Sequence, residues 1–291
     1  MSYPIEVVDG AGTKSPPLPL LREIPEPPER LTYRGQLPSA ELKLLSVVGS
    51  RRYTRYGAEV VSHLIKGLAG YPVGIVSGLA LGVDSLAHEA ALTHGLYTLA
   101  IPGSGLDDAV LYPRQHRPLA RRIMENGGGL LSEFAPDFSA TPWSFPRRNR
   151  LIAGVSHATL VIEAAEQSGS LITARLATDY NRELLVVPGS IFSDNSRGTH
   201  QFLKLGATPV TEAVDILAVL GIEEVAAPAS PAPLGNLPSQ AAQVIQLLRE
   251  PTERDTLIRQ LGLPTAEATA LLTELELMGT ITQRDGIYRR A

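Results

Sequence analysis

Short runs of glycine, serine and arginine follow several apolar segments of this sequence and could bind an anion. Residues 49–52 read Gly-Ser-Arg-Arg, and residues 168–170 read Ser-Gly-Ser. Backbone N–H groups at the start of a helix, serine hydroxyls and guanidinium groups together favour phosphate. Neither run has the spacing of a dinucleotide-binding glycine fingerprint or of a Walker A loop. Both runs therefore predict phosphate contacts, with a solvated arginine loop as the alternative for the first.

A third segment joins an aromatic ring to several cations. Residues 145–150 read Phe-Pro-Arg-Arg-Asn-Arg, and Pro146 suits the first turn of a helix, which would place Arg147 and Arg150 on one face. An exposed ring beside arginines stacks a nucleobase next to phosphate contacts, which is typical of single-stranded nucleic-acid binding. The alternative is that Phe145 lies in the core and the arginines pair with Glu133 or Glu163. We expect at least one arginine to do so.

Few residues are suited to catalysis. Asp84 and His88 could ligate a metal or relay a proton, but no third ligand lies nearby in sequence, so we favour Asp84 as a helix cap that His88 satisfies. Glu133 and Glu163 follow predicted strands, which leaves a nucleotide enzyme of the phosphoribohydrolase type as the alternative function. The Pro-Gly-Gly-x-Gly-Thr signature of that enzyme type is absent. We therefore expect no catalytic residue, no metal and no cofactor.

Composition limits the class of protein. The chain has 291 residues, 44% of them hydrophobic, no cysteine and a net charge of −4. The lack of cysteine excludes disulfides, thiolate nucleophiles and cysteine-ligated metals. No apolar run approaches the ~18–20 residues that span a bilayer, and the N-terminus has no basic flank of a secretory signal. These features predict a cytoplasmic protein with no membrane contact, whose anion site is a local one.

The elements that must position these side chains follow an alternating pattern. From about Leu42, short apolar runs alternate with helix-like segments. The runs are Leu44–Val48, Val73–Val76, Tyr97–Ile101, Gly129–Leu131, Ala158–Ile162 and Leu184–Val187. This alternation predicts an extended Rossmann-like, doubly wound, mostly parallel α/β domain over residues 41–222. Ligands bind at the carboxyl ends of such strands. Residues 1–40, rich in proline, predict an extended arm, with packing on the next domain from Leu31 onward as one option.

The C-terminal part predicts a second, smaller domain. Residues 223–238 are rich in alanine and proline and predict a linker. Three helical patterns and a hairpin with an Asp285-Gly286 turn then match a winged helix over residues 239–291. A three-helix bundle would bury the same residues. The acids Glu267, Glu274 and Glu276 disfavour a sequence-specific repressor, so we expect protein contacts or weak duplex binding from this domain.

Taken together, these segments resemble the DNA-processing protein A family of bacteria (DprA, also called Smf). They occur in the family's order across about residues 24–210. The matching stretches are Val47–Arg51, Val76–Gly82 with Asp84 and His88, Tyr112-Pro113, Leu131–Glu133, Phe145–Arg150, Ser168–Ala174, Pro188-Gly189 and Gly206-Ala207. One departure is Pro142, which stands where many members carry a lysine.

The resemblance implies a homodimer that binds single-stranded DNA, protects incoming DNA during natural transformation and helps load the recombinase RecA. Carried over by motif, residues 49–51 would hold phosphate, and residues 145–150 would stack a base and neutralise the backbone. The residues expected to bind single-stranded DNA are Gly49, Ser50, Arg51, Arg52, Phe145, Arg147, Arg148, Asn149, Arg150, Ser168, Gly169 and Ser170. Those expected at the dimer interface are His200, Phe202, Leu203 and Pro209.

Overall fold

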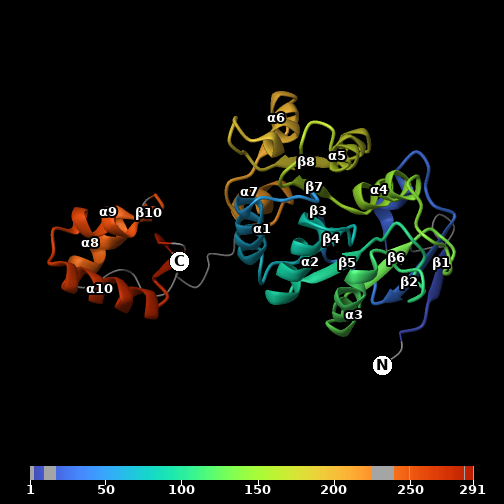
Figure 1. Ribbon diagram of the computed structural model, residues 1–291. Helices are drawn as coiled ribbons and strands as arrows, with labels where there is room; N and C mark the ends of the chain where they lie inside the picture. The colour runs from blue at the N-terminus through green and yellow to red at the C-terminus, as the bar shows by residue number, and fades with distance from the viewer. Residues whose placement is uncertain (1–2, 10–17, 224–238, 249, 285, 291) are drawn as a thin grey trace. The chain divides into compact units, whose positions relative to one another are not determined.

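The chain divides into two compact units, Met1–Glu224 and Val225–Ala291. The computed structural model describes residues 3–9, 18–223, 239–248, 250–284 and 286–290 (Figure 1). The predicted linker, apart from Glu223, therefore lies outside the described residues. In that described part of the chain, no helix combines the length and apolar character needed to cross a membrane.

Among the described residues, the first unit is built on a nine-stranded sheet in the order β1-β2-β6-β5-β4-β3-β7-β8-β9. The strands are β1 (Glu6–Asp9), β2 (Arg30–Gly35), β3 (Lys43–Val48), β4 (Val73–Ser77), β5 (Tyr97–Ala100), β6 (Gly129–Ser132), β7 (Ala158–Val161), β8 (Glu183–Val186) and β9 (Thr208–Pro209). Neighbours from β6 through β9 pair in parallel, whereas β1 with β2 and β2 with β6 are antiparallel. The predicted mostly parallel sheet is confirmed.

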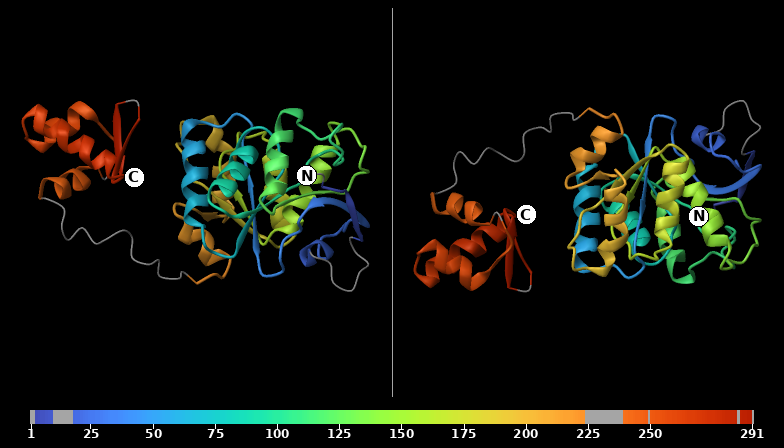
Figure 2. Two further views of the ribbon diagram at one scale, coloured as in Figure 1. Left: turned by 90° about the horizontal axis from the view of Figure 1, so that it is seen from below. Right: turned by 90° about the horizontal axis from the view of Figure 1, so that it is seen from above.

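Helices cover both faces of this sheet (Figure 2). They are α1 (Arg55–Gly67), α2 (Val83–Thr93), α3 (Arg117–Glu125), α4 (Ser144–Val155), α5 (Ser170–Asp179), α6 (Arg197–Lys204) and α7 (Ala213–Val219). In strand β3, apolar residues stand on both sides of Ser46 without alternating with polar ones. Leu45 and Val47 pack in the core that includes α1 and α2, while Leu44 and Val48 pack in the core that includes α4 and α5. A strand covered on both faces buries every side chain, as the doubly wound fold requires.

The first forty residues need a correction, because their described part belongs to the sheet. Strand β2 pairs with β6, with Thr32 opposite Ser132, and β1 continues the same sheet. Leu21 and Ile24 are buried in the core beside α4. Prolines before and after these short strands interrupt the hydrophobic periodicity, so the sequence here predicts no strand. Pairing with β6 nevertheless makes this segment one edge of the sheet.

The order of the strands fixes where a ligand site can form. β3 has β4 on one side and β7 on the other, so the chain reverses its winding between β3 and β7. The loops after these two strands begin at Gly49 and Ile162 and emerge at the same carboxyl edge. Gly82 brings the start of α2 against the first loop. Its φ is 88°, and a Cβ there would lie 2.3 Å from the Ser50 carbonyl oxygen.

The described residues of the second unit form three helices and a small antiparallel sheet. The helices are α8 (Ser239–Leu247), α9 (Arg254–Leu261) and α10 (Thr265–Leu277), and the sheet order is β10 (Thr252–Glu253), β12 (Ile287–Arg290), β11 (Ile281–Arg284). Val244, Leu257, Leu272, Ile281 and Tyr288 lie in one buried cluster. The predicted winged helix is confirmed, with β10 as a strand that the sequence pattern does not predict. Asp285 of the predicted turn lies outside the described residues.

Candidate nucleic-acid interface

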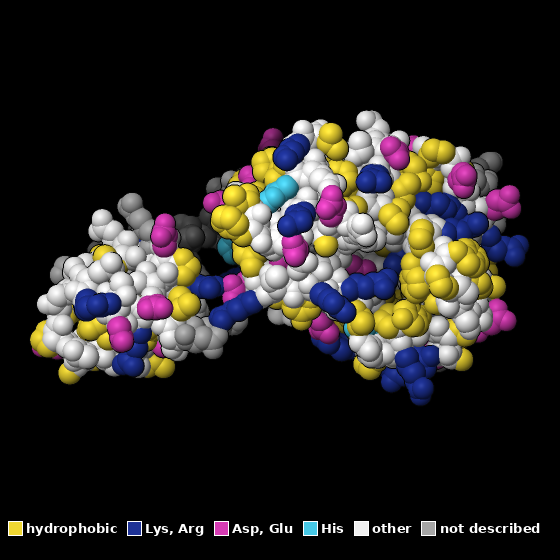
Figure 3. All heavy atoms as spheres, turned by 45° about the horizontal axis from the view of Figure 1, so that its top comes forward, with side chains coloured by type: hydrophobic (Ala, Val, Ile, Leu, Met, Phe, Trp, Pro, Cys, Tyr) yellow, Lys and Arg dark blue, Asp and Glu magenta, His cyan; other side chains and the backbone are white. Residues whose placement is uncertain are grey.

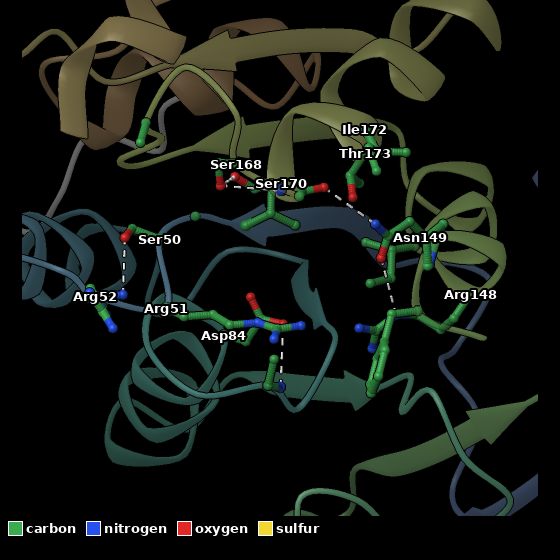
Figure 4. Close-up of a pocket in the computed structure, with 18 of the residues that line it drawn as sticks. Ser50, Arg51, Arg52, Asp84, Arg148, Asn149, Ser168, Ser170, Ile172 and Thr173 are labelled. Atoms are coloured by element: carbon green, nitrogen blue, oxygen red, sulfur yellow. Dashed lines mark hydrogen bonds between the residues drawn. The ribbon is translucent and has the colours of Figure 1, made fainter. Parts of the chain in front are cut away.

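A cleft of about 700 Å³ opens at the carboxyl edge of the large sheet, where the strand order reverses (Figure 4). The loop after β3, the start of α4 and the start of α5 supply most of its lining. The predicted DNA-binding residues that the structure brings together there are Gly49, Ser50, Arg51, Arg52, Phe145, Arg148, Asn149, Ser168, Gly169 and Ser170. Arg147 and Arg150 are outside the lining. In Figure 4, Ser168 and Ser170 lie across the cleft from Arg51 and Asp84.

The loop after β3 is held by polar contacts that leave its arginines at the surface. The buried Ser50 hydroxyl accepts a hydrogen bond from the Arg52 N–H at 3.0 Å. Glu163, which follows β7, accepts from the Thr54 N–H at 2.8 Å and from its hydroxyl at 2.5 Å. Thr54 in turn caps α1. Arg51 and Arg52 are exposed, so two guanidinium groups stand at the edge of the cleft.

Phe145 lies in the cleft wall, half-buried, and does not join the main cores. The Arg51 guanidinium carbon is 5.6 Å from the centroid of its ring, and the Tyr112 ring lies at 5.5 Å. Gly103 makes room for it, since a Cβ at that position would lie 2.6 Å from the Phe145 ring. The ring is thus fixed from one side and lines the cleft, as a stacking surface requires.

Arg148 has a different place from the one the sequence predicts. Its side chain is buried and donates to the carbonyl oxygens of Gly78 and Ile101, at the ends of β4 and β5. Burial lowers the pKa of its guanidinium to about 10, against the opposing effect of Asp84. These hydrogen bonds anchor α4 to the sheet, while Arg148 also lines the cleft, so its phosphate contact stays a prediction.

Arg147 and Arg150 confirm the expectation that some arginines of this segment pair with Glu133. Both donate to the same oxygen of that carboxylate. Arg150 also donates to the Glu26 carbonyl and is buried, so it ties α4 to the N-terminal segment. Its role as a DNA contact stays a prediction, which these contacts make less direct than that of Arg51 or Arg52. The Arg147 side chain is 56% exposed and remains accessible beside the cleft.

The start of α5 forms the opposite side of the cleft. The hydroxyls of Ser168 and Ser170 lie 2.7 Å apart in a hydrogen bond. The Asn149 side chain donates to the Gly169 carbonyl at 3.5 Å, which links α4 to this turn. Gly169 is exposed and is the N-cap of α5. The N–H groups of Ser170, Leu171 and Ile172 already donate to Ser168 and Gly169. The anion contact at this helix start therefore stays a prediction.

Asp84 and His88 are expected from the sequence to pair with each other, but each has other partners. One Asp84 oxygen accepts from the N–H groups of Gly78 and Ala80, and burial raises the pKa of this carboxyl against the opposing charge of Arg148. The His88 Nδ1 bonds to the Thr98 hydroxyl at 2.7 Å. Burial lowers the pKa of His88 to about 3, so the imidazole is neutral. The two hydrogen bonds that Asp84 accepts hold the loop after β4 in place.

Comparison with known proteins identifies the chain. The family model described as DNA recombination-mediator protein A matches residues 12–221. The chain belongs to this family. A second model, the DprA winged helix domain, matches residues 225–286. Protein Smf of Escherichia coli K12 is 39% identical over 270 residues, covering 90% of this chain and 72% of the relative. DprA of Streptococcus pneumoniae R6 is 42% identical over 198 residues, covering 68% and 69%.

Solved structures of DprA proteins share the fold. The X-ray structure of DprA from Streptococcus pneumoniae has a TM-score of 0.64 at 40% identity and covers 68% of this chain and 69% of that one. DprA from Helicobacter pylori, whose structure is described as giving insight into its single-stranded DNA binding mode, has a TM-score of 0.64 at 28% identity. It covers 75% of this chain and 96% of that one.

The predicted dimer residues of this DprA-family chain lie on α6 and β9, at the end of the sheet opposite β1. Phe202 is buried in its own core, and His200 bonds to the Gly189 carbonyl at 3.1 Å. Pro209 is exposed, as is the neighbouring Leu205, which is 81% exposed. The apolar surface of this face is therefore supplied by Leu205 and not by Phe202, the residue predicted from the sequence.

Sequence reasoning about this DprA-family chain missed some residues around the cleft. Asn195 lines it and donates to the Arg52 carbonyl at 2.9 Å, and Tyr112 packs on Phe145. Both residues come from loops without periodicity or motif spacing. The sequence pointed to Tyr112 alone, because Tyr112-Pro113 is one of the stretches that resemble the family. Figure 3 shows Lys and Arg side chains gathered around a hollowed part of the first unit.

Proposed function

We propose that this protein is a recombination mediator that binds single-stranded DNA in the cleft between the ends of β3 and β7. The Arg51–Phe145 pair carries the proposal, because it places a cation and a half-buried ring side by side at the cleft. Stacking of bases on aromatic rings and contacts of cations with the backbone give sequence-tolerant binding of single strands. The single-stranded DNA binding mode described for the Helicobacter pylori relative supports it.

The charge distribution around the cleft also supports binding of a polyanion. Asp84 is buried near Arg148, and Glu163 is buried while it accepts hydrogen bonds from Thr54. Arg51 and Arg52, by contrast, are exposed. A net charge of −4 is therefore compatible with a positive field at this edge, because association depends on the local field.

A finer role is suggested by the resemblance to the family. We propose that a homodimer joins two such clefts on one strand, which gains avidity without new contacts. It would protect incoming DNA during natural transformation and load RecA in the cytoplasm. The test of loading is the rate of RecA filament formation on single-stranded DNA with and without this protein. An unchanged rate would contradict the loading role.

A nucleotide-processing enzyme has less support from the geometry. Glu163 accepts two hydrogen bonds from Thr54, and Glu133 pairs with Arg147 and Arg150. Both oxygens of Glu163 and one oxygen of Glu133 are thus occupied by contacts that hold the fold. Release of free base from nucleoside monophosphates, lost in Glu163→Gln, would favour the enzyme instead.

The first experiment is fluorescence anisotropy of labelled oligo-dT and of a matching duplex, titrated with the protein over a series of salt concentrations. We expect a preference for the single strand and a log–log salt slope of about −0.7 for each phosphate neutralised. No binding at low salt would overturn the proposal.

A further inference from the structure

Trp143 is an exposed indole that the cleft itself does not use. It precedes α4 directly and is 54% exposed. Its ring centroid lies 5.8 Å from that of Phe134 and 5.6 Å from that of Phe138, at steep angles to both. Those two phenylalanine rings are stacked on each other at 4.6 Å. Trp143 therefore packs against the side of a rigid aromatic pair while much of its ring faces solvent.

The position of Trp143 connects it to the cleft. Its neighbour Pro142 lines the cleft, as does Phe145, two residues farther on. A strand that follows the cleft past Pro142 would reach the indole next. An aromatic side chain whose packing already fixes it loses little conformational entropy when a base stacks on it.

A cationic residue lies one helical turn from Trp143. The backbone N–H of Arg147 donates to the Trp143 backbone carbonyl at 3.4 Å. It shares the Glu133 carboxylate with Arg150. Two guanidinium groups on one carboxylate leave a net positive charge, and Arg147 is the exposed member, 56% against 11% for Arg150. A ring next to such a cation fits a nucleotide better than an apolar protein surface.

We propose that Trp143 is a second stacking platform, which takes the base of a nucleotide that leaves the cleft past Pro142, while Arg147 neutralises the adjoining phosphate. This inference rests on the proposed binding of single-stranded DNA in the cleft. It extends the DNA track along α4, and it supplies aromatic and cationic contacts at the place where Pro142 brings no charge.

Trp143 is the single tryptophan of the chain, so its emission reports on this site alone. The experiment follows tryptophan fluorescence and the anisotropy of labelled oligo-dT in the same titration, with oligonucleotides of increasing length. We expect short oligonucleotides to bind without shielding the indole. Longer ones should quench its emission and protect it from acrylamide.

The two readouts separate the two proposals. Absence of any anisotropy change would overturn the binding function itself. Saturated anisotropy at every length with an indole that stays equally accessible to acrylamide would overturn the Trp143 platform and leave the cleft function in place.

Variants give an independent test in the full-length protein. Trp143→Leu keeps an apolar side chain but removes the aromatic face, and Trp143→Phe keeps a smaller one. We expect Trp143→Leu to bind long oligo-dT about tenfold more weakly and short oligo-dT unchanged, with Trp143→Phe close to the parent. Leu277→Ala, an exposed truncation in the second unit, is the control. Equal affinity of Trp143→Leu and the parent at all lengths would contradict the platform.

Discussion

The guanidinium carbon of Arg51 lies 5.6 Å from the centroid of the Phe145 ring. This contact joins the loop after β3 to the first turn of α4, two segments far apart in sequence that the sheet brings to one edge. A cation above an aromatic face is attracted by the electrons of the ring. The pair therefore holds both groups in place before a strand binds.

We expect Phe145→Ala and Arg51→Ala each to weaken binding of single-stranded DNA, Phe145→Ala by about 1–3 kcal/mol because a stacked base is lost. The double variant should lose less than the sum, with a coupling energy of about 0.5–1 kcal/mol, because the two side chains contact each other. Anisotropy of labelled oligo-dT measures all three variants. Parental affinity in both single variants would remove the site from this cleft.

Neighbouring arginines should respond in opposite ways to the same substitution. Arg148→Gln leaves Asp84 buried without its nearby cation and removes donors from two carbonyls, so we expect the free energy of unfolding to fall by about 3 kcal/mol or more. Arg147→Gln should change it by less than about 0.5 kcal/mol but reduce the salt slope of binding by about 0.7. Urea denaturation and salt titrations measure these effects. A stable Arg148→Gln with a reduced salt slope would reverse the assignment.

The sequence predicts the parallel strands because apolar residues dominate them without strict alternation, as Leu44–Val48 shows around its single Ser46. Glycine also follows β3, β4 and β5 directly or within three residues. The same loops meet at one edge in any parallel sheet, so the phosphate-type runs at residues 49–52 and 168–170 could be placed together before the structure was known.

The roles of the individual arginines could not be predicted. Arg147, Arg148 and Arg150 fall within a single helical turn, and only the rotation of α4 against the sheet decides which one points outward. The sequence around these arginines does not predict that Arg148 donates hydrogen bonds to the carbonyl oxygens of Gly78 and Ile101. Likewise β1 and β2 are stabilised by pairing with distant β6, which a window of local sequence does not contain.

His88 should make stability depend on pH. Burial lowers its pKa in the folded protein to about 3, below the ordinary value of about 6.5, so protonation favours the unfolded chain. The stabilisation is complete above the ordinary pKa, and it is lost as the pH falls from there towards the folded value, by up to about 1.4 kcal/mol per pH unit. Asp84 has the opposite sign, because its raised carboxyl pKa costs stability as the pH rises.

The difference between the parent and His88→Asn isolates this contribution, since Asn can still bond to Thr98 and does not titrate. We expect the urea midpoint of the parent to fall more steeply with acidification than that of His88→Asn. Two parallel pH profiles would show that His88 is not the group responsible.

Removing the winged helix, residues 223–291, should leave binding of single-stranded DNA within about 0.5 kcal/mol of the parent, because the described residues that line the cleft all belong to the first unit. The cleft is lined by residues of the first unit, which has its own buried cores. Helix α10 carries Glu267, Glu274 and Glu276, a charge that repels phosphate. Anisotropy of oligo-dT with the truncated chain measures this. Complete loss of binding in a truncated chain that still unfolds cooperatively would require the winged helix to take part in holding the strand.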